Sequence, residues 1–419
     1  MSGTDICETF HHAMNGGTHT GGRVLGIDRW LLRKFLHGMG DPRIRASLWD
    51  GKVVVTSMPA PAAGMVIHDR ATLWRLVANP LLNFGEDYST GRIGIEGGLV
   101  EFMEAVYRAM AKGRRHSPPA AGRRTRSANS LAGSRDNIHH HYDIGNDFYR
   151  LWLDREMVYT CAYFPHPEAT LEEAQAAKME LVCRKLRLQP GQAVVEAGCG
   201  WGALALHMAR NHGVTVRSFN ISHEQIAYAR DRARAEGLEG RIEYVEDDYR
   251  NIAGRYDAFV SVGMLEHVGP NHYRELGKVI DRSLTEHGLG LIHSIAQDVP
   301  EPLSPWLLKR IFPGSYPPTL REMMEVFEPW GFSVLDVENL RLHYAKTLEH
   351  WLARFEENRE RIAGMFDDCF VRAWRLYLAG AIANFRVGKL QLFQVVFARS
   401  ANNLIPLTRS HLLDPTGHA

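Results

Sequence analysis

The stretch Val194–Gly202, which reads V-V-E-A-G-C-G-W-G, decides the fold of this chain. A short apolar run ends in an acidic residue, turns through three glycines and passes into an apolar helical pattern. This order predicts a buried strand, a tight turn and the start of a helix. Gly198, Gly200 and Gly202 permit backbone conformations and a close ligand approach that a Cβ atom would prevent. The carboxylate of Glu196 can accept hydrogen bonds from the hydroxyl or amino groups of a ligand.

The spacing of the glycines argues against two common kinds of nucleotide-binding site. It differs from the dinucleotide-binding pattern G-x-G-x-x-G, and no Lys-Ser or Lys-Thr pair follows to hold phosphate. Taken alone, the loop could also be an ordinary turn between a strand and a helix. The segments after it weaken that alternative, because strands and helices alternate there. Strands are expected over 214–219, 241–245, 256–262 and 289–295, with helices over 222–235 and 272–284.

This alternation predicts an α/β fold with a mostly parallel sheet and crossover helices. Ligands of such sheets bind at the carboxyl ends of the strands. Candidate functional residues are expected at or just after those ends: Gly198, Asn220, Asp248, Glu266 and His293.

The N-terminal part has a different texture and is expected to form a small α+β domain. Strands are predicted over 53–55 and 65–67, helices over 71–77 and 99–110, and turns around a brief strand over 85–97. Further helices are expected over 347–361 and 367–382, and a last strand over 390–397. The expected organisation is a flexible N-terminus (1–22), the small domain (23–111), a basic linker (112–130), the large domain (131–405) and a C-terminal tail (406–419).

Composition excludes several classes of protein. The net charge is +1, so no overall field favours nucleic acid. The five cysteines are scattered and form no C-x-x-C pair, which argues against a disulfide framework or a structural zinc site. We therefore expect no metal. The first residues lack the pattern of a signal peptide, and no apolar run is long enough to span a membrane. The basic linker could attract anionic lipid head groups.

Further motifs follow one another along the chain and carry a family resemblance. They are His139–Asp143 with Asn146–Tyr149, Tyr159–Phe164, Gly263–Gly269, Ile292–Ile295 and His343–Leu348. With the glycine-rich loop, they resemble the cyclopropane-fatty-acyl-phospholipid synthases and the mycolic acid cyclopropane synthases. The resemblance is strong over residues 130–400 and weaker over the small N-terminal domain. It implies a Rossmann-like class I methyltransferase domain that uses S-adenosylmethionine.

The resemblance also implies which residues hold S-adenosylmethionine. Tyr159 and Thr160 match the positions at its carboxylate end, and the glycine-rich loop matches the segment under its methionine and ribose. The implied cofactor-binding residues are Tyr159, Thr160, Glu196, Gly198, Gly200, Gly202, Asn220, Ile221, Gln225, Tyr249 and Arg250. Each has a structural alternative when considered singly, for example Tyr159 as a core residue. Their joint occurrence favours the cofactor.

A second cluster follows from the chemistry of the family. Methyl transfer to a cis alkene makes a carbocation, and ring closure needs a base to remove a proton from the added methyl. In this family the base is thought to be a bound bicarbonate ion. Its cradle matches Cys161, Glu266, His293, the backbone of Ile295, and Tyr344. Glu266 must either accept the hydroxyl of bicarbonate or be protonated, because a carboxylate repels an anion. Ala381 stands where some members carry a cysteine once proposed as catalytic, so that role is impossible here.

The resemblance implies an enzyme that converts cis double bonds of membrane phospholipid acyl chains to cyclopropanes. It would be cytoplasmic, in peripheral contact with an anionic membrane surface on its inner face, and a homodimer. Trp30–Leu32, Phe35, Leu36 and the basic linker are expected to dock. One alternative keeps cofactor and lipid but gives a methylene or methyl-branched product. A lipid-binding protein with a degenerate site and a small-molecule N-methyltransferase are the others.

Overall fold

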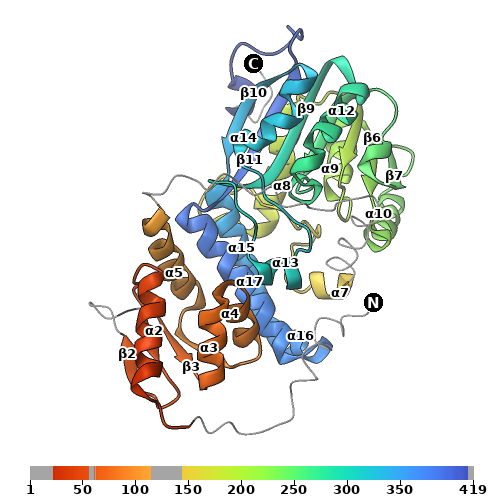
Figure 1. Ribbon diagram of the computed structural model, residues 1–419. Helices are drawn as coiled ribbons and strands as arrows, with labels where there is room; N and C mark the ends of the chain where they lie inside the picture. Colours follow the sequence, from red (N-terminus) through yellow and green to blue (C-terminus); the bar gives the residue numbers. More distant parts are fainter. Residues whose placement is uncertain (1–21, 56–60, 62, 115–143, 414–419) are drawn as a thin grey trace. The chain divides into compact units, whose positions relative to one another are not determined.

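The computed structural model describes residues 22–55, 61, 63–114 and 144–413 (Figure 1). Predictions for Cys7, for residues 1–21, for most of the basic linker and for His139–Asp143 lie outside these residues. The chain divides into two compact units, which are described separately. One comprises residues 1–124, 301–313 and 348–389, and the other comprises 125–300, 314–347 and 390–419.

The second unit is built on a mostly parallel sheet, which confirms the predicted α/β class. Its strands are β5 (Ala193–Ala197), β6 (Thr215–Asn220), β7 (Ile242–Glu246), β8 (Tyr256–Val262), β9 (Leu284–Gln297), β10 (Phe332–Asn339) and β11 (Leu390–Arg399). Within the described residues, the order is β10-β11-β9-β8-β5-β6-β7. Strands β5 to β9 are parallel, and β11 runs antiparallel to both of its neighbours.

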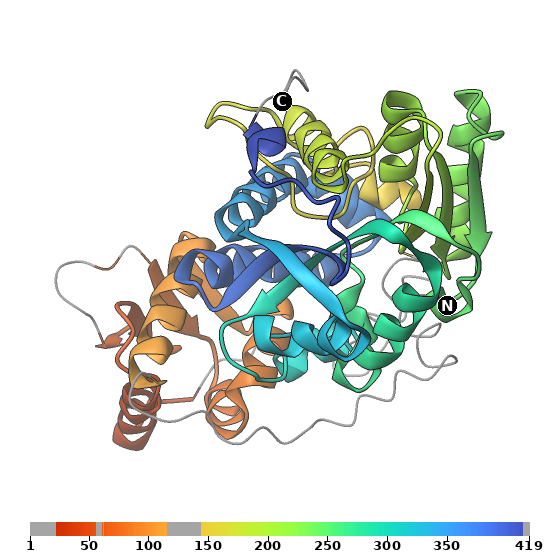
Figure 2. The same cartoon turned by 90° about the horizontal axis from the view of Figure 1, so that it is seen from above.

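Helices cover both faces of this sheet (Figure 2). Successive residues of a strand point to opposite faces. Val194 packs into the apolar core that includes α8 (Leu171–Leu186), α9 (Ala203–His212) and α10 (His223–Ala235). Val195 packs into the core formed with α12 (Tyr273–Ser283). Burial on both sides explains the continuous apolar character of β5 in the sequence.

The candidate functional residues lie at or after strand ends, as predicted, except His293. Gly198 follows β5 directly, and Asn220 is the last residue of β6. His293 lies inside β9, because this strand continues to Gln297, where it pairs with β11. The position still aligns with the carboxyl edge of the neighbouring strand, since His293 pairs with Val262, the last residue of β8.

The first unit has its own small sheet, with the order β2-β1-β3-β4 among the described residues. Its N-terminal elements are α2 (Gly26–Gly38), β1 (Arg45–Ser47), β2 (Val53–Val55), β3 (Ala63–Ile67), α3 (Arg70–Ala78), α4 (Pro80–Ser89), β4 (Ile93–Gly97) and α5 (Leu99–Arg114). Helices α13 (Pro305–Arg310), α16 (Arg359–Met365) and α17 (Asp368–Val387) belong to the same unit. Helix α17 packs against α4 and α5 (Figure 1). The predicted small α+β arrangement is thereby confirmed.

Two local predictions were wrong. Residues 85–89 form the end of helix α4 rather than a turn, although they contain Gly85. A Cβ atom at Gly85 would lie 2.4 Å from Cγ of Trp306, so the glycine serves close packing of α4 against α13. The helix expected over 347–361 is in fact the second part of α15 (Arg341–Glu357) followed by α16.

The sequence-based domain boundaries placed 301–313 and 348–389 in the large domain, whereas in space they group with the first unit.

Short helices complete the described fold. They are α7 (Asn146–Tyr149), α11 (Leu265–Val268), α14 (Leu320–Met323), α18 (Ser410–Leu413), and the 3₁₀ turns η1 (Tyr249–Asn251), η2 (Pro270–His272), η3 (Met324–Val326) and η4 (Glu328–Trp330). Among the described residues, no helix has the length and apolarity needed to cross a membrane.

Candidate active site

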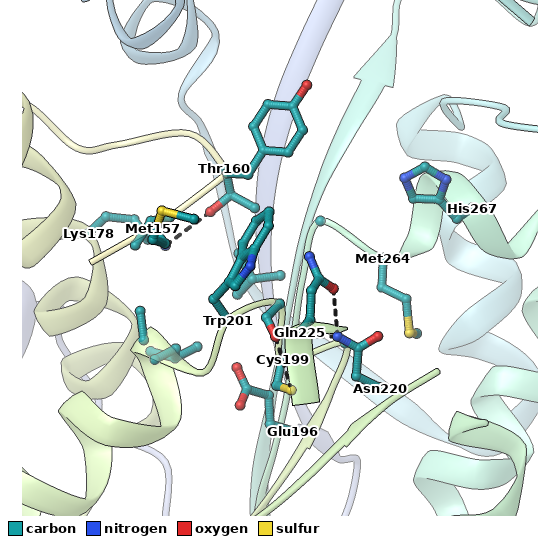
Figure 3. Close-up of a pocket in the computed structure, with 18 residues that line it drawn as sticks. Met157, Thr160, Lys178, Glu196, Cys199, Trp201, Asn220, Gln225, Met264 and His267 are labelled. Carbon is teal, nitrogen blue, oxygen red and sulfur yellow. Dashed lines mark hydrogen bonds between the residues drawn. The ribbon is translucent and has the colours of Figure 1, made fainter. Parts of the chain in front are cut away.

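A pocket opens at the carboxyl end of β5, where the strand order reverses between β6 and β8. It contains about 790 Å³ of empty space, part of it open to solvent. Figure 3 shows Thr160 and Lys178 on one side, Met264 and His267 on the other, and Trp201 between them. Six of the predicted cofactor residues besides Thr160 line it: Tyr159, Glu196, Gly198, Gly200, Asn220 and Gln225.

The glycine-rich loop takes backbone conformations that favour glycine. Gly198 has φ +89°, and a Cβ there would lie 3.1 Å from Cβ of Met264. Gly202 has φ +86°, and a Cβ there would lie 2.5 Å from the hydroxyl of Tyr244 and 2.8 Å from Cβ of Ala229. The first position keeps the pocket open, and the second seats the start of α9.

Glu196 presents a buried carboxyl group to the pocket. It lies on β5 and accepts a hydrogen bond from Ser218 on the neighbouring strand. Burial raises the pKa of Glu196 to about 7, partly offset by the Ser218 hydrogen bond and by the charge of Lys178. A ligand that donates hydrogen bonds would favour the ionised form.

Two amide side chains form the wall beside the loop. Asn220 Nδ2 donates to Oε1 of Gln225 over 2.8 Å and lies 3.3 Å from the carbonyl oxygen of Gly200. Oδ1 of Asn220 accepts from the backbone N–H of Ser222. These contacts hold the amides in fixed orientations at the end of β6.

Lys178 is a pocket residue that the sequence analysis missed. Its ammonium group donates to Oγ1 of Thr160 over 3.1 Å, although only 2% of the residue is exposed. Burial lowers the pKa of Lys178 to about 8, while the charges of Asp154 and Glu196 act in the opposite direction. A signal was present in the sequence, because a lysine interrupts the apolar stripe of α8.

His267 lies on the far wall of the pocket and stays neutral. Burial lowers its pKa to about 4, and its Nδ1 lies 2.9 Å from the hydroxyl of Ser315. Above the loop, Trp201 donates its indole N–H to Oδ1 of Asn146 on α7 over 2.7 Å. The ring of Tyr149 lies 4.9 Å from that of Trp201 and 5.5 Å from that of Tyr159. These aromatic contacts thus hold the segment that carries Tyr159 and Thr160 beside the glycine-rich loop.

Four predicted cofactor residues do not line this pocket: Gly202, Ile221, Tyr249 and Arg250. Gly202 acts through the start of α9, as described above. The guanidinium of Arg250 is bound by Asp248 at 3.0 Å and Glu275 at 3.1 Å, which holds it along η1. Tyr249 is buried in the core beside α12. Their contact with a cofactor remains a prediction.

The four side chains of the predicted base cradle are all buried, and their contacts are described in turn. Glu266 on α11 accepts a hydrogen bond from Oγ of Ser294 over 2.9 Å and another from the backbone of Ile295. Burial raises the pKa of Glu266 to about 7. The backbone group expected to serve the anion is therefore bound to Glu266 in this structure.

The other three side chains are those of Cys161, Tyr344 and His293. The thiol of Cys161 lies 3.9 Å from the carbonyl oxygen of Leu340 and interacts with Thr347. These two residues lie four positions before and three positions after Tyr344 in the sequence. Burial raises the pKa of the Cys161 thiol, so this group stays protonated. His293 Nδ1 lies 3.0 Å from Nε2 of Gln394 on β11. Its Nε2 is buried with no hydrogen-bond partner among the described residues.

The pocket and the cradle meet at adjacent residues. Thr160 lines the pocket and is followed by Cys161, and His267 lines it and is preceded by Glu266. The charge of Lys178 reaches both regions, because it acts on Glu196 in the pocket and on Cys161 and His293 in the cradle. A group transferred out of the pocket on this side would arrive beside the cradle.

Comparison with known proteins agrees with this geometry. Residues 129–395 match the family described as mycolic acid cyclopropane synthetase, and residues 31–116 match a domain of unknown function. A probable fatty acid methyltransferase of Pseudomonas putida is 33% identical over 88% of this chain and 96% of its own. The cyclopropane-fatty-acyl-phospholipid synthase of Escherichia coli K12 is 40% identical over 64% of this chain and 69% of its own.

A solved structure shares the fold. The mycolic acid cyclopropane synthase CmaA1 complexed with SAH and CTAB aligns with a TM-score of 0.60 and 29% identity. The alignment covers 63% of this chain and 97% of that one. The large unit therefore has the class I methyltransferase fold.

Proposed function

The chain belongs to the mycolic acid cyclopropane synthetase family, and from this premise we propose a specific reaction. The chain is an S-adenosylmethionine-dependent methyltransferase. The proposed substrate is a cis double bond in the acyl chain of a membrane phospholipid, and the proposed product is a cyclopropane ring. The observation that carries the proposal is the meeting of the pocket and the cradle at Thr160–Cys161 and Glu266–His267.

The pocket suits a cationic cofactor that carries a carboxylate at one end. The residues proposed to hold it are Glu196, Asn220 and Gln225 with the glycine loop, and Thr160 with Lys178 at the opposite wall. The ammonium of Lys178 carries a positive charge, which attracts a carboxylate. The neutral imidazole of His267 avoids repulsion of a sulfonium centre.

The cradle suits an oxyanion such as bicarbonate. Cys161 keeps its proton, and burial lowers the pKa of His293 well below its usual value, so both groups are neutral. Nε2 of His293 is buried and has no hydrogen-bond partner in the part of the chain that the structure describes, so a bound ion could satisfy it. Glu266, with its pKa near 7, can donate a hydrogen bond to an anion when protonated. When bound, bicarbonate would supply the base that removes a proton from the added methyl.

Access to a bilayer substrate is proposed through α2. Ile27 and Trp30 are each 51% exposed on one side of this helix, and the ammonium of Lys34 lies 4.9 Å from the Trp30 ring. Apolar and aromatic side chains beside a basic group are typical of helices that bind membrane surfaces. Leu32 and Leu36 are buried in the core, so they cannot take the docking role expected of them. Location at the inner face of a membrane and a homodimeric state remain predictions.

A second product is also proposed as an alternative. The Pseudomonas putida relative, which matches more of this chain than the Escherichia coli synthase does, is named a probable fatty acid methyltransferase. Loss of a proton from a neighbouring chain carbon would give a methyl-branched alkene instead of a ring, and a hydride shift followed by loss of a proton from the added methyl would give a methylene branch. The cradle supports ring closure, because it places candidate proton-handling groups at one side of the pocket.

The proposal can be tested with purified protein, S-adenosylmethionine and vesicles. Vesicles of a cis-monounsaturated phospholipid are compared with vesicles of its saturated analogue, each with and without added bicarbonate, and the acyl chains are analysed by mass spectrometry. We expect a gain of one CH₂ per modified chain in the unsaturated lipid alone, faster with bicarbonate. If the free cis-monounsaturated fatty acid, offered in a parallel assay, is alkylated and the phospholipid is not, the phospholipid assignment is wrong. No gain in any acyl substrate would overturn lipid alkylation.

A further inference from the structure

Four side chains with metal-binding chemistry meet between α8 and α9, away from the residues that line the pocket. Glu180 and Cys183 lie about one turn apart on α8, and His207 and His212 lie on α9. The ligand atoms of Cys183, His207 and His212 all lie within 4.8 Å of one another. The sequence could not reveal this cluster, because its members come from two helices that meet only in the fold.

The two imidazoles converge on one point. A single carboxylate oxygen of Glu180 lies 3.2 Å from Nε2 of His207 and 3.1 Å from Nε2 of His212. Zinc binds nitrogen and oxygen ligands at about 2.0–2.2 Å, so the edges of its coordination tetrahedron measure about 3.3 Å. The observed separations are therefore close to those between ligands of one zinc ion.

We propose that Cys183, His207 and His212 bind a zinc ion, with Glu180 as the fourth ligand. One thiolate, two neutral imidazoles and one carboxylate suit zinc in ligand type and number. Calcium and magnesium prefer oxygen ligands and do not fit this set. As the sulfur–zinc bond forms, the thiol of Cys183 releases its proton to solvent, and the thiolate and carboxylate balance the two positive charges.

The surroundings support such a site. Asn211 places its side-chain amide 3.0 Å from Nδ1 of His207. A histidine that binds metal through Nε2 carries its proton on Nδ1 and donates it to a neighbouring oxygen. The amide of Asn211 supplies that oxygen after a half-turn, since its oxygen and nitrogen occupy equivalent positions. The side chains of Glu180 and His212 are 40% and 18% exposed, which gives an ion a route inward.

The position of the cluster indicates a structural role. Helix α8 carries Lys178 of the pocket, and α9 begins directly after the glycine-rich loop. A zinc ion with four protein ligands has no open position for chemistry. It would instead fasten together the two helices that frame one side of the pocket. Without metal, the same groups can share hydrogen bonds through Glu180, which is the alternative that an experiment must exclude.

Cobalt(II) is the probe for this test, because it replaces zinc and absorbs visible light. The full-length chain, kept reduced and freed of metal with a chelator, is titrated with cobalt(II). We expect one equivalent to bind with the visible bands of tetrahedral cobalt and a near-ultraviolet thiolate-to-cobalt band, and one equivalent of zinc to remove both. Zinc should also raise the melting temperature by several degrees.

Variants assign the signal to the cluster. Cys183→Ser should abolish the thiolate band, and His212→Gln, at a partly exposed position, should weaken cobalt binding at least tenfold. Cys369→Ser and His223→Gln lie outside the cluster and should leave the spectrum unchanged. Circular dichroism establishes that each variant is folded.

Three results would overturn the proposal. The first is a folded wild-type chain that shows no stoichiometric tetrahedral spectrum. The second is a spectrum without a thiolate band, or one that persists in both Cys183→Ser and His212→Gln. The third is a spectrum lost equally in the Cys369→Ser control.

Discussion

The pocket and the cradle lie side by side in the chain but are built in opposite ways. The pocket is open to solvent and holds charged groups that have partners, such as Lys178 against Thr160. The cradle is fully buried at Cys161 and nearly so at His293, and burial favours the neutral form of each. A charged cofactor needs opposing charges, whereas a bound anion needs neutral donors without a competing ion.

The origins of the two regions differ as well. The pocket is centred on one continuous loop and the ends of β5 and β6, so most of its shape follows from local sequence. The cradle draws on α11, β9, the segment before α8 and the start of α15. Cofactor binding and base chemistry should therefore respond separately to substitution.

The largest difference between the effect on product formation and the effect on cofactor binding is expected for Glu266→Gln. This change keeps the shape and the contact with Ser294 but removes the carboxyl proton that the cradle uses. General acid–base groups typically contribute a hundredfold or more to rate. We expect product formation on unsaturated vesicles to fall at least a hundredfold, while the Kd for S-adenosylmethionine, measured by calorimetry, changes less than about twofold. A comparable loss of cofactor affinity would show that Glu266 belongs to the pocket.

The same variant should change the pH dependence of stability. The folded pKa of Glu266 is about 7, above its ordinary value of 4.5, so the folded state holds this proton more tightly than the unfolded chain. The resulting stabilisation is complete below pH 4.5 and is lost as pH rises through 7. The wild type should therefore lose up to about 3 kcal/mol relative to Glu266→Gln between pH 4.5 and pH 8.

Urea unfolding of both proteins across that range measures the difference. Glu180→Gln is an informative companion, because hydrogen bonds from His207 and His212 lower the pKa of the Glu180 carboxyl group, so the stabilisation that Glu180 gives the wild type should be lost only as pH falls below 4.5. Parallel stability curves for wild type and Glu266→Gln would contradict the burial argument.

Gly202→Ala tests whether the loop serves the pocket. The added Cβ would meet the Tyr244 hydroxyl and Ala229 at a backbone φ of +86°, so the start of α9 must shift. We expect the Kd for S-adenosylmethionine to rise about tenfold, in line with strain of one to three kcal/mol. Gly237→Ala is the matched control, since Gly237 has φ +67° with open space around it. Equal effects of the two variants would show that backbone strain alone is responsible.

The smallest effect is expected at Lys178, where the two regions are coupled. The charge of Lys178 lowers the pKa of Glu196, so Lys178→Met should raise that pKa further above its ordinary value. At pH 6.5 the carboxyl would then be more protonated and cofactor binding weaker by about threefold, with recovery toward pH 8.5.

A double variant with Glu196→Gln provides the control for this coupling. In the Glu196→Gln background, the Lys178→Met change should lose its pH dependence. A pH-independent loss in both backgrounds would show that Lys178 acts through packing or through the proposed contact with the cofactor's carboxylate, and not through Glu196.

Sequence alone predicted most of the large sheet, because its central strands are continuous apolar runs that end at functional residues. Strand β8 was placed at residues 256–262, as observed. Strand β10, which lies at the edge of the sheet and consists mostly of half-buried and exposed residues, was not predicted. The helical state of Gly85 was missed because it depends on Trp306, far away in the chain.

The candidate site was predicted where a residue belongs to a motif and missed where it depends on packing between elements. Thr160, Glu196 and Asn220 line the pocket, and their contact with a cofactor stays a prediction. Lys178 was overlooked because α8 carries no motif, although its position on an apolar stripe was a usable signal. The link from Glu266 to Ile295 joins α11 to β9 and requires the folded chain.

The most direct test of the central claim uses S-adenosylmethionine with a trideuterated methyl group and cis-monounsaturated phospholipid vesicles. If the cradle removes a proton from the added methyl, the product acyl chain must retain two deuterium atoms and have no double bond. This is the result that the account predicts. A chain that retains all three deuterium atoms has lost its proton from elsewhere, which would contradict ring closure and establish a methyl-branched product.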